Sequence, residues 1–120
     1  MLLRRGFKEY PVKDEYISKG TFHYIIESVK DLFNDLPLKE ALVRKAVYLL
    51  HRIIVQHPFL DGNKRTGFGV ADAFLRLSEV KIVADPDEIV TFTVSIAKGR
   101  ENEEHVYRWI VQHLRSAEHK

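Results

Sequence analysis

His57-Pro58-Phe59-Leu60-Asp61-Gly62-Asn63-Lys64-Arg65 is a short segment, largely polar, between two stretches whose apolar residues recur every three or four positions. That spacing is typical of helices that bury one face. The stretch before the segment starts at Leu38, and near its end apolar residues cover most of the helix circumference. This pattern predicts a central, buried helix. Pro58 disfavours the helical conformation at His57 and so helps to end that helix. The stretch after the segment predicts a second helix over residues 66–77.

Three further helices are predicted from caps and apolar spacing. Thr21 is a candidate cap for a helix whose apolar positions run from Phe22 to Phe33. Asp85-Pro86 combines a capping carboxylate with proline at the first helical position, and Gly99 can end the helix that follows. The β-branched residues within 90–94 leave a strand as the competing interpretation there.

Asn102 can cap a last helix, with two glutamates in its first turn. No repeat or linker interrupts the chain. The prediction is therefore a single domain over residues 1–120, all-α, folded as a compact bundle of about five or six helices.

Composition narrows the classes of protein. The chain has 120 residues, of which 45% are apolar and 30% charged, the ordinary balance of a globular domain. It contains no cysteine, which excludes disulfides and thiolate zinc sites and fits a cytoplasmic location. The net charge of +2 gives no argument for direct nucleic-acid binding. No apolar run approaches the roughly 20 residues that span a bilayer, and no signal peptide is recognisable, so no membrane partner is expected.

The second half of the polar segment has the residues of an anion cradle. Gly62 permits positive φ and lets a ligand approach the main chain. Asn63 would open the following helix, and helix N-termini bind anions through their N–H groups and dipole. Lys64 adds a point charge, and Arg65 can grip a phosphate through two parallel hydrogen bonds.

The first half of the segment has the residues of a reactive centre. His57 can accept a proton near neutral pH and so is a candidate general base. Asp61 offers the hard oxygen that Mg²⁺ takes alongside substrate phosphates. Each residue alone has an ordinary interpretation, as a cap, a turn or a solvated face. Their joint occurrence between two apolar helices favours a site for phosphoryl or nucleotidyl transfer.

The segment resembles the signature of the Fic/Doc family, H-P-F-x-D/E-G/A-N-G/K-R, and agrees with it at every fixed position. Further stretches also look like Doc-type members of the family, so the resemblance extends over roughly residues 38–115. These stretches are Lys45-Ala46-Val47-Tyr48-Leu49-Leu50, Phe74-Leu75-Arg76-Leu77, Ile96-Ala97-Lys98-Gly99 and Trp109.

The resemblance implies the helical Fic/Doc fold and ATP-dependent modification of a protein hydroxyl. By position, it makes His57 the base that deprotonates the target Ser, Thr or Tyr, and Asp61 the Mg²⁺ ligand. It assigns the anion cradle to Gly62, Asn63, Lys64 and Arg65, with Arg65 also in the catalytic set.

Two positions distinguish the subclass. AMP-transferring relatives have glycine where this chain has Lys64, and a second arginine where it has Phe68. Both features are shared with Doc (death on curing), in which the nucleotide is reversed and the γ-phosphate is transferred. The resemblance thus implies a Doc-type kinase toxin of a toxin–antitoxin pair, whose known family target is elongation factor Tu. Gly62 departs from this pattern, because Doc often has alanine there.

Two alternatives remain open. The first is a Fic-type AMP transferase that uses the same residues. The second is a catalytically idle module for protein interaction or nucleic-acid binding, against which the complete motif and the small net charge both argue.

Two further features of the family can be compared with this sequence. Ala97-Lys98-Gly99-Arg100-Glu101-Asn102 is close to the family's autoinhibitory pattern, but it lacks the hydroxyl and contains a helix-breaking glycine, so it is predicted to be a turn between helices. Inhibition is then expected from a separate antitoxin. A β-hairpin flap usually lies upstream of the motif, and residues 1–20 or 34–39 are the candidates for it.

Overall fold

The computed structural model describes residues 18–58 and 61–117. Within these ranges it contains five helices and a two-stranded sheet, in agreement with the predicted helical class. The elements are α1 (Lys19–Val29), α2 (Leu38–Gln56), α3 (Asn63–Arg76), β1 (Val80–Ile82), α4 (Pro86–Ala97), α5 (Glu103–Gln112) and β2 (Leu114–Ser116).

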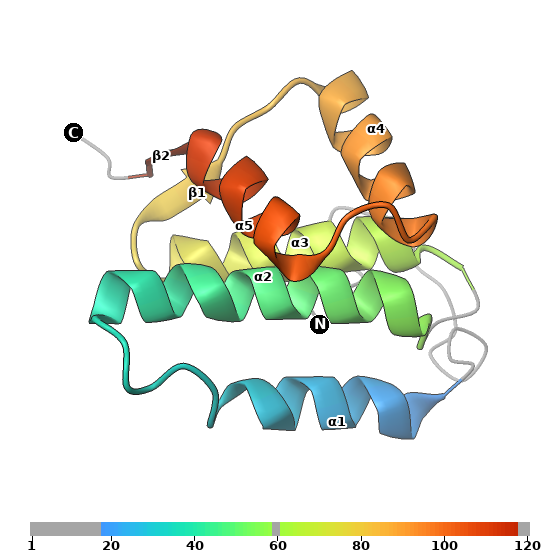
Figure 1. Cartoon of the computed structure of the whole chain (residues 1–120), viewed down its shortest axis with the longest axis horizontal. Helices are drawn as coiled ribbons and strands as arrows, with labels where there is room; N and C mark the ends of the chain where they lie inside the picture. The colour runs from blue at the N-terminus through green and yellow to red at the C-terminus, as the bar shows by residue number, and fades with distance from the viewer. Residues whose placement is uncertain (1–17, 59–60, 118–120) are drawn as a thin grey trace.

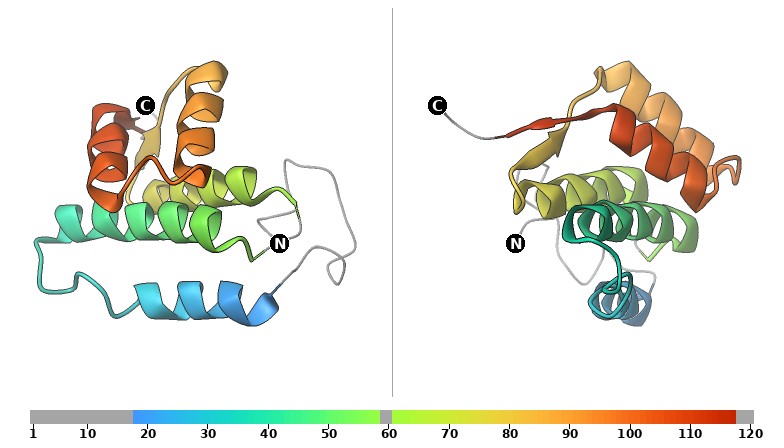
Figure 2. Two further views of the ribbon diagram at one scale, coloured as in Figure 1. Left: turned by 45° about the vertical axis from the view of Figure 1, so that its right-hand side comes forward. Right: turned by 60° about the vertical axis from the view of Figure 1, so that its left-hand side comes forward.

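The helices form three layers, with α1 on one side of the α2–α3 pair and α4 with α5 on the other (Figures 1 and 2). Helix α2 packs against each of the other four helices, which confirms its predicted central position. Its buried residues are Ala41, Ala46, Val47, Tyr48, Leu49, Leu50, Ile53 and Ile54. The helix that leads into the motif is therefore the one with the most tertiary support.

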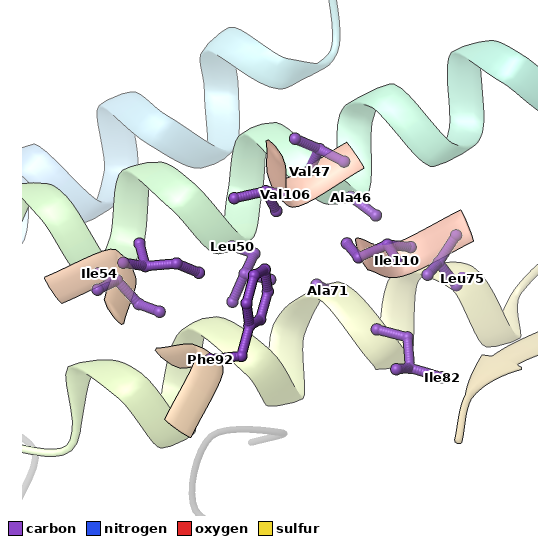
Figure 3. Close-up of a cluster of buried hydrophobic side chains, with 11 residues drawn as sticks. Ala46, Val47, Leu50, Ile54, Ala71, Leu75, Ile82, Phe92, Val106 and Ile110 are labelled. Carbon is purple, nitrogen blue, oxygen red and sulfur yellow. The ribbon is translucent and has the colours of Figure 1, made fainter. Parts of the chain in front are cut away.

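Two apolar clusters cover opposite faces of α2. The larger lies between α2, α3, β1, α4 and α5 and includes Leu50, Leu75, Phe92 and Ile110 (Figure 3). The smaller joins α1 to α2 and consists of Phe22, Ile25, Val29, Tyr48, Leu49 and Ile53. The layer of α1 and the layer of α4 and α5 thus attach to the central helix through separate sets of side chains.

Gly67 brings α3 close to α2. A Cβ atom at this buried position would lie 3.2 Å from the Leu50 carbonyl oxygen and 3.1 Å from Ile54 Cγ1. Both distances are shorter than ordinary van der Waals contact, and one of the two atoms is backbone. The helix-propensity cost of glycine is therefore offset by a close approach of the two helices that carry the motif.

Helix α4 forms as its capping signal predicts, although residues 90–94 are rich in β-branched side chains. Asp85 and Glu88 form a capping box around its first turn, with Pro86 at the first helical position. Phe92 and Ile96, one helical turn apart, are buried. Residues 90–94 are therefore helical, and the competing strand is excluded. Gly99, at φ 76°, ends the helix as predicted.

The 97–102 segment starts at the last residue of α4 and connects it to α5, so it is a turn between helices, as predicted. Asn102 caps α5 by accepting a hydrogen bond from the His105 N–H. The Glu101 carboxylate accepts a 2.7 Å hydrogen bond from Ser95 Oγ and lies 3.3 Å from His105 Nδ1. These two partners lie on α4 and α5, so the Glu101 side chain joins the two helices at the turn.

One predicted helix cap was wrong, and one sheet was not predicted. Ser18, and not Thr21, caps α1: its Oγ accepts a 3.1 Å hydrogen bond from the Thr21 N–H. The antiparallel β1–β2 pair was not predicted, and its strands come from far apart in the sequence. The Asp72 carboxylate of α3 supports this pair by accepting from the Ile82 N–H at 2.9 Å.

The flap was not located. Residues 34–37 form a turn without a strand, and residues 38–39 begin α2, so this candidate is wrong. Of the other candidate, residues 1–20, the first 17 lie outside the described residues, and the remaining three cap and start α1.

Candidate active site

The motif occupies the connection between the C-terminal end of α2 and the N-terminal end of α3 (Figure 1). The structure describes all of it except residues 59–60, so the prediction that Phe59 fixes the loop in the core lies outside the described residues. The N-terminal end of α1 lies at the same end of the molecule.

His57 is the C-cap of α2 and adopts a left-handed conformation, with φ 48° and ψ 56°. Histidine tolerates this region better than most residues, but the conformation still costs about 1–3 kcal/mol. The side chain is exposed, and it makes no hydrogen bond with any described residue. The next residue, Pro58, is fully buried. A buried proline therefore anchors the chain directly after an exposed imidazole.

Asp61 is exposed and forms no hydrogen bond or ion pair within the described part of the chain. Its carboxylate lies one residue before the N-cap of α3 and so next to the helix end that favours anions. No three histidine, aspartate or glutamate side chains gather as a metal cage among residues 18–58 and 61–117. A cation held through Asp61 would take most of its ligands from phosphate and water, as Mg²⁺ commonly does.

Gly62 is the N-cap of α3 and has φ 78°, a conformation that favours glycine. Its carbonyl accepts the first helical hydrogen bond, 2.8 Å from the Thr66 N–H. A Cβ atom at Gly62 would lie 3.0 Å from Arg65 Nη2, so the Arg65 guanidinium folds back over the start of its own helix. The absence of a side chain at Gly62 leaves room for this cation.

Asn63, Lys64 and Arg65 form the first turn of α3, and both cations are exposed. The helix thus begins at Asn63, as predicted for the anion cradle, three residues before the Thr66 start of the predicted 66–77 stretch. Positive charge gathers at the N-terminal end of α3, where the helix dipole already favours an anion. One turn later, Phe68 packs against the larger apolar cluster. These features suit an anionic ligand, with the strongest positive charge in the first turn of α3.

One residue of this region was missed by reasoning from the sequence. The main-chain N–H of Ser18 donates a 3.1 Å hydrogen bond to the Pro58 carbonyl. A serine three residues before a threonine and followed by an apolar helical pattern is a cap signal, but nothing in the sequence places that cap beside the motif.

A family model for the Fic/DOC family matches residues 2–75. The chain belongs to the Fic/DOC family. The matched residues contain α1, α2, the whole motif and nearly all of α3. The match includes residues 2–37, which the resemblance over roughly residues 38–115 does not cover, and it ends at residue 75. No curated protein matches the chain closely enough to add a relative.

Fic/DOC enzymes generally transfer nucleotide or phosphate groups onto proteins, and they use ATP and a divalent metal. Family membership therefore implies protein targets for this chain, and often an antitoxin. Within the described ranges, no helix combines the length and the apolar character needed to cross a bilayer.

Proposed function

We propose that this protein is a Doc-type toxin that transfers the γ-phosphate of ATP to a protein hydroxyl. The observation that carries this proposal is the charge pattern of α3. Lys64 and Arg65 are exposed in its first turn, whereas Phe68 packs on the core and brings no second cation. The strongest anion site therefore lies at the loop end of the helix. A terminal phosphate held there is nearest His57 and the incoming hydroxyl.

Six residues divide the chemistry between them. His57 takes the proton of the target hydroxyl as its oxygen attacks the γ-phosphorus, and the bond to ADP breaks. Lys64 and Arg65, with the α3 N-terminus and its residues Gly62 and Asn63, hold the phosphates and offset the charge that develops on them. Asp61 would hold Mg²⁺, which neutralises phosphate charge when bound.

The proposed reaction also implies a protein substrate and an inhibitor. The substrate is a protein with an accessible Ser, Thr or Tyr hydroxyl, such as a translation factor of the elongation factor Tu type in the cytoplasm. The inhibitor is a cognate antitoxin, because the 97–102 turn is occupied by its own hydrogen bonds. Residues 1–120 act as a single domain in this proposal.

AMP transfer is the second candidate, and Gly62 is the observation that favours it. AMP-transferring relatives resemble this chain at that position, where the φ of 78° favours glycine. The same base and cradle would then act on the α-phosphate, with loss of pyrophosphate.

Labelled ATP distinguishes the two reactions. The protein is incubated with cell lysate and either γ-labelled or α-labelled ATP, and the modified protein is analysed by mass spectrometry. We expect label from γ-labelled ATP alone and an added phosphate on the target. Label from α-labelled ATP alone would establish AMP transfer. Absence of both labels, together with steeply salt-dependent DNA binding, would favour the idle module.

Asp61→Asn provides a control for the role of the metal. The amide keeps the size of the side chain and removes its charge. We expect Mg²⁺ to bind weakly to the wild-type protein without nucleotide and well with it, and Asp61→Asn to weaken the second binding. Calorimetry with and without a non-hydrolysable ATP analogue measures both. Tight Mg²⁺ binding to the free protein would contradict the assignment.

A further inference from the structure

The hydrogen bond between Ser18 and Pro58 joins the start of α1 to the motif. The donor is the main-chain N–H of Ser18 and the acceptor is the carbonyl of Pro58, at 3.1 Å. The acceptor belongs to the residue that directly follows the proposed base. A distant segment of the chain therefore fixes a peptide group inside the active-site loop.

Ser18 is itself held firmly by α1. Its Oγ accepts hydrogen bonds from the Thr21 N–H at 3.1 Å and from the Thr21 hydroxyl at 2.7 Å. The helix that it caps is anchored on α2 by Phe22, Ile25 and Val29, which are buried in the smaller apolar cluster. The position of the Ser18 N–H is thus set by helix packing and does not depend on the loop.

His57 needs this kind of support because its backbone is in the left-handed region. Residues in such conformations persist only where the surrounding structure determines them. The α2 helix fixes the chain before His57, and buried Pro58 continues it on the other side. The hydrogen bond from Ser18, the N-cap of α1, adds a restraint on the Pro58 peptide from a separate part of the fold.

We propose that Ser18 is a positioning residue for transfer. Its main-chain N–H holds the Pro58 peptide and thereby the orientation of the His57 imidazole. This inference rests on the proposed function, which makes His57 the base. It predicts that α1, which carries none of the motif residues, contributes to the rate of the chemical step.

The test replaces one backbone N–H by an ester oxygen. A chain made by ligation carries the α-hydroxy analogue of serine at position 18, which removes the donor and keeps the side chain. The matched control is the same amide-to-ester change at Leu32, whose N–H donates to the Val29 carbonyl at 3.3 Å beyond the opposite end of α1. Each ester removes one main-chain hydrogen bond next to α1, but only the bond donated by Ser18 has its acceptor in the motif loop.

We expect the ester at position 18 to lower kcat about tenfold or more, because small displacements of a reacting group slow transfer strongly. The KM for ATP should change less than about twofold, since the phosphate cradle is not altered. The ester at position 32 should leave kcat within about twofold. A kcat at position 18 equal to that at position 32 would overturn the proposal.

One further measurement separates positioning from folding and from the proposed function. The NMR signals of a labelled His57 ring should shift or broaden in the position-18 ester and not in the control. This holds even if the unmodified chain transfers nothing, an outcome that would defeat the proposed function alone. If the His57 signals stay unchanged in the position-18 ester, Ser18 has only a structural role.

Discussion

At position 57 an exposed imidazole is attached to a strained backbone, and this combination determines how the residue should be tested. His57→Asn keeps a residue type that tolerates φ 48°, and it removes the base. We expect His57→Asn and His57→Ala to reduce transfer by at least about 10²-fold, the usual contribution of a general base. Binding of an ATP analogue should be nearly unchanged. Label transfer and calorimetry measure the two effects.

His23→Ala is the matched control for that experiment. His23 is also an exposed histidine and lies on α1, away from the motif sequence. Its removal should leave transfer within about twofold. If His57→Asn transfers at the wild-type rate, His57 is not the base.

Gly62 allows the backbone requirement to be separated from the space that Arg65 needs. Gly62→Ala places a Cβ 3.0 Å from Arg65 Nη2 in a backbone with φ 78°. Gly99→Ala imposes the same kind of strain at φ 76°, with no other atom within 4 Å of the new Cβ. Each change should destabilise the fold by about 1 kcal/mol or more. We expect only Gly62→Ala to weaken nucleotide binding, because only there does a guanidinium have to move.

Thermal unfolding and calorimetry with an ATP analogue provide the two measurements. Equal losses of nucleotide affinity in the two alanine variants would show that Arg65 adapts without consequence. In that case the glycine is needed for its backbone alone.

At the scale of elements, the contact between α2 and α3 decides how precisely the motif is held. Gly67→Ala would place a Cβ 3.2 Å from the Leu50 carbonyl, which cannot move without bending α2. Overpacking costs about 1–3 kcal/mol and exceeds the roughly 1 kcal/mol gained in helix propensity. The melting temperature should fall by several degrees.

Gly20→Ala is the control for this prediction. Gly20 lies within α1, and a Cβ there would have no other atom within 4 Å. Helix propensity then acts alone, so this variant should be more stable than the wild type by up to about 1 kcal/mol. An increase in the stability of Gly67→Ala would show that the two helices can move apart freely.

The elements also show where sequence reasoning succeeds. The Asp85-Pro86 start of α4 and the Asn102 cap of α5 are local signals, and both were predicted correctly. The cap of α1 was misplaced because Thr21 directly precedes the apolar pattern, whereas the helix begins earlier with Lys19 and Gly20, which carry no such pattern.

The pairing of strands that lie far apart in the sequence could not be predicted from local patterns. Strands β1 and β2 have three residues each, and they form a sheet only because the fold pairs Val80 with Ser116. The same difference between local and long-range features applies to the candidate active site. Its motif is contiguous and could be recognised, whereas the Ser18–Pro58 bond depends on how α1 packs. The roles assigned to the motif residues remain predictions until transfer is measured.

At the scale of the whole molecule, we predict that the protein is toxic without a partner. Expression alone should arrest bacterial growth, because the 97–102 turn does not supply the autoinhibitory pattern of the family. His57→Ala, expressed to the same level, should relieve the arrest. Growth curves with immunoblots of both proteins test this. Normal growth in the presence of transfer-active wild-type protein would count against a toxin role.

The attachment of α1 mainly to α2 has a consequence for how the molecule opens. A helix held on one side by a small cluster is a candidate for opening in native-state hydrogen exchange before the rest of the fold. Because Ser18 holds Pro58, such an opening would also release the loop. Linkage is reciprocal, so any ligand that requires the closed loop must slow the exchange of α1 amides. A molecule that binds the outer face of α1 could then tune transfer without touching a single motif residue.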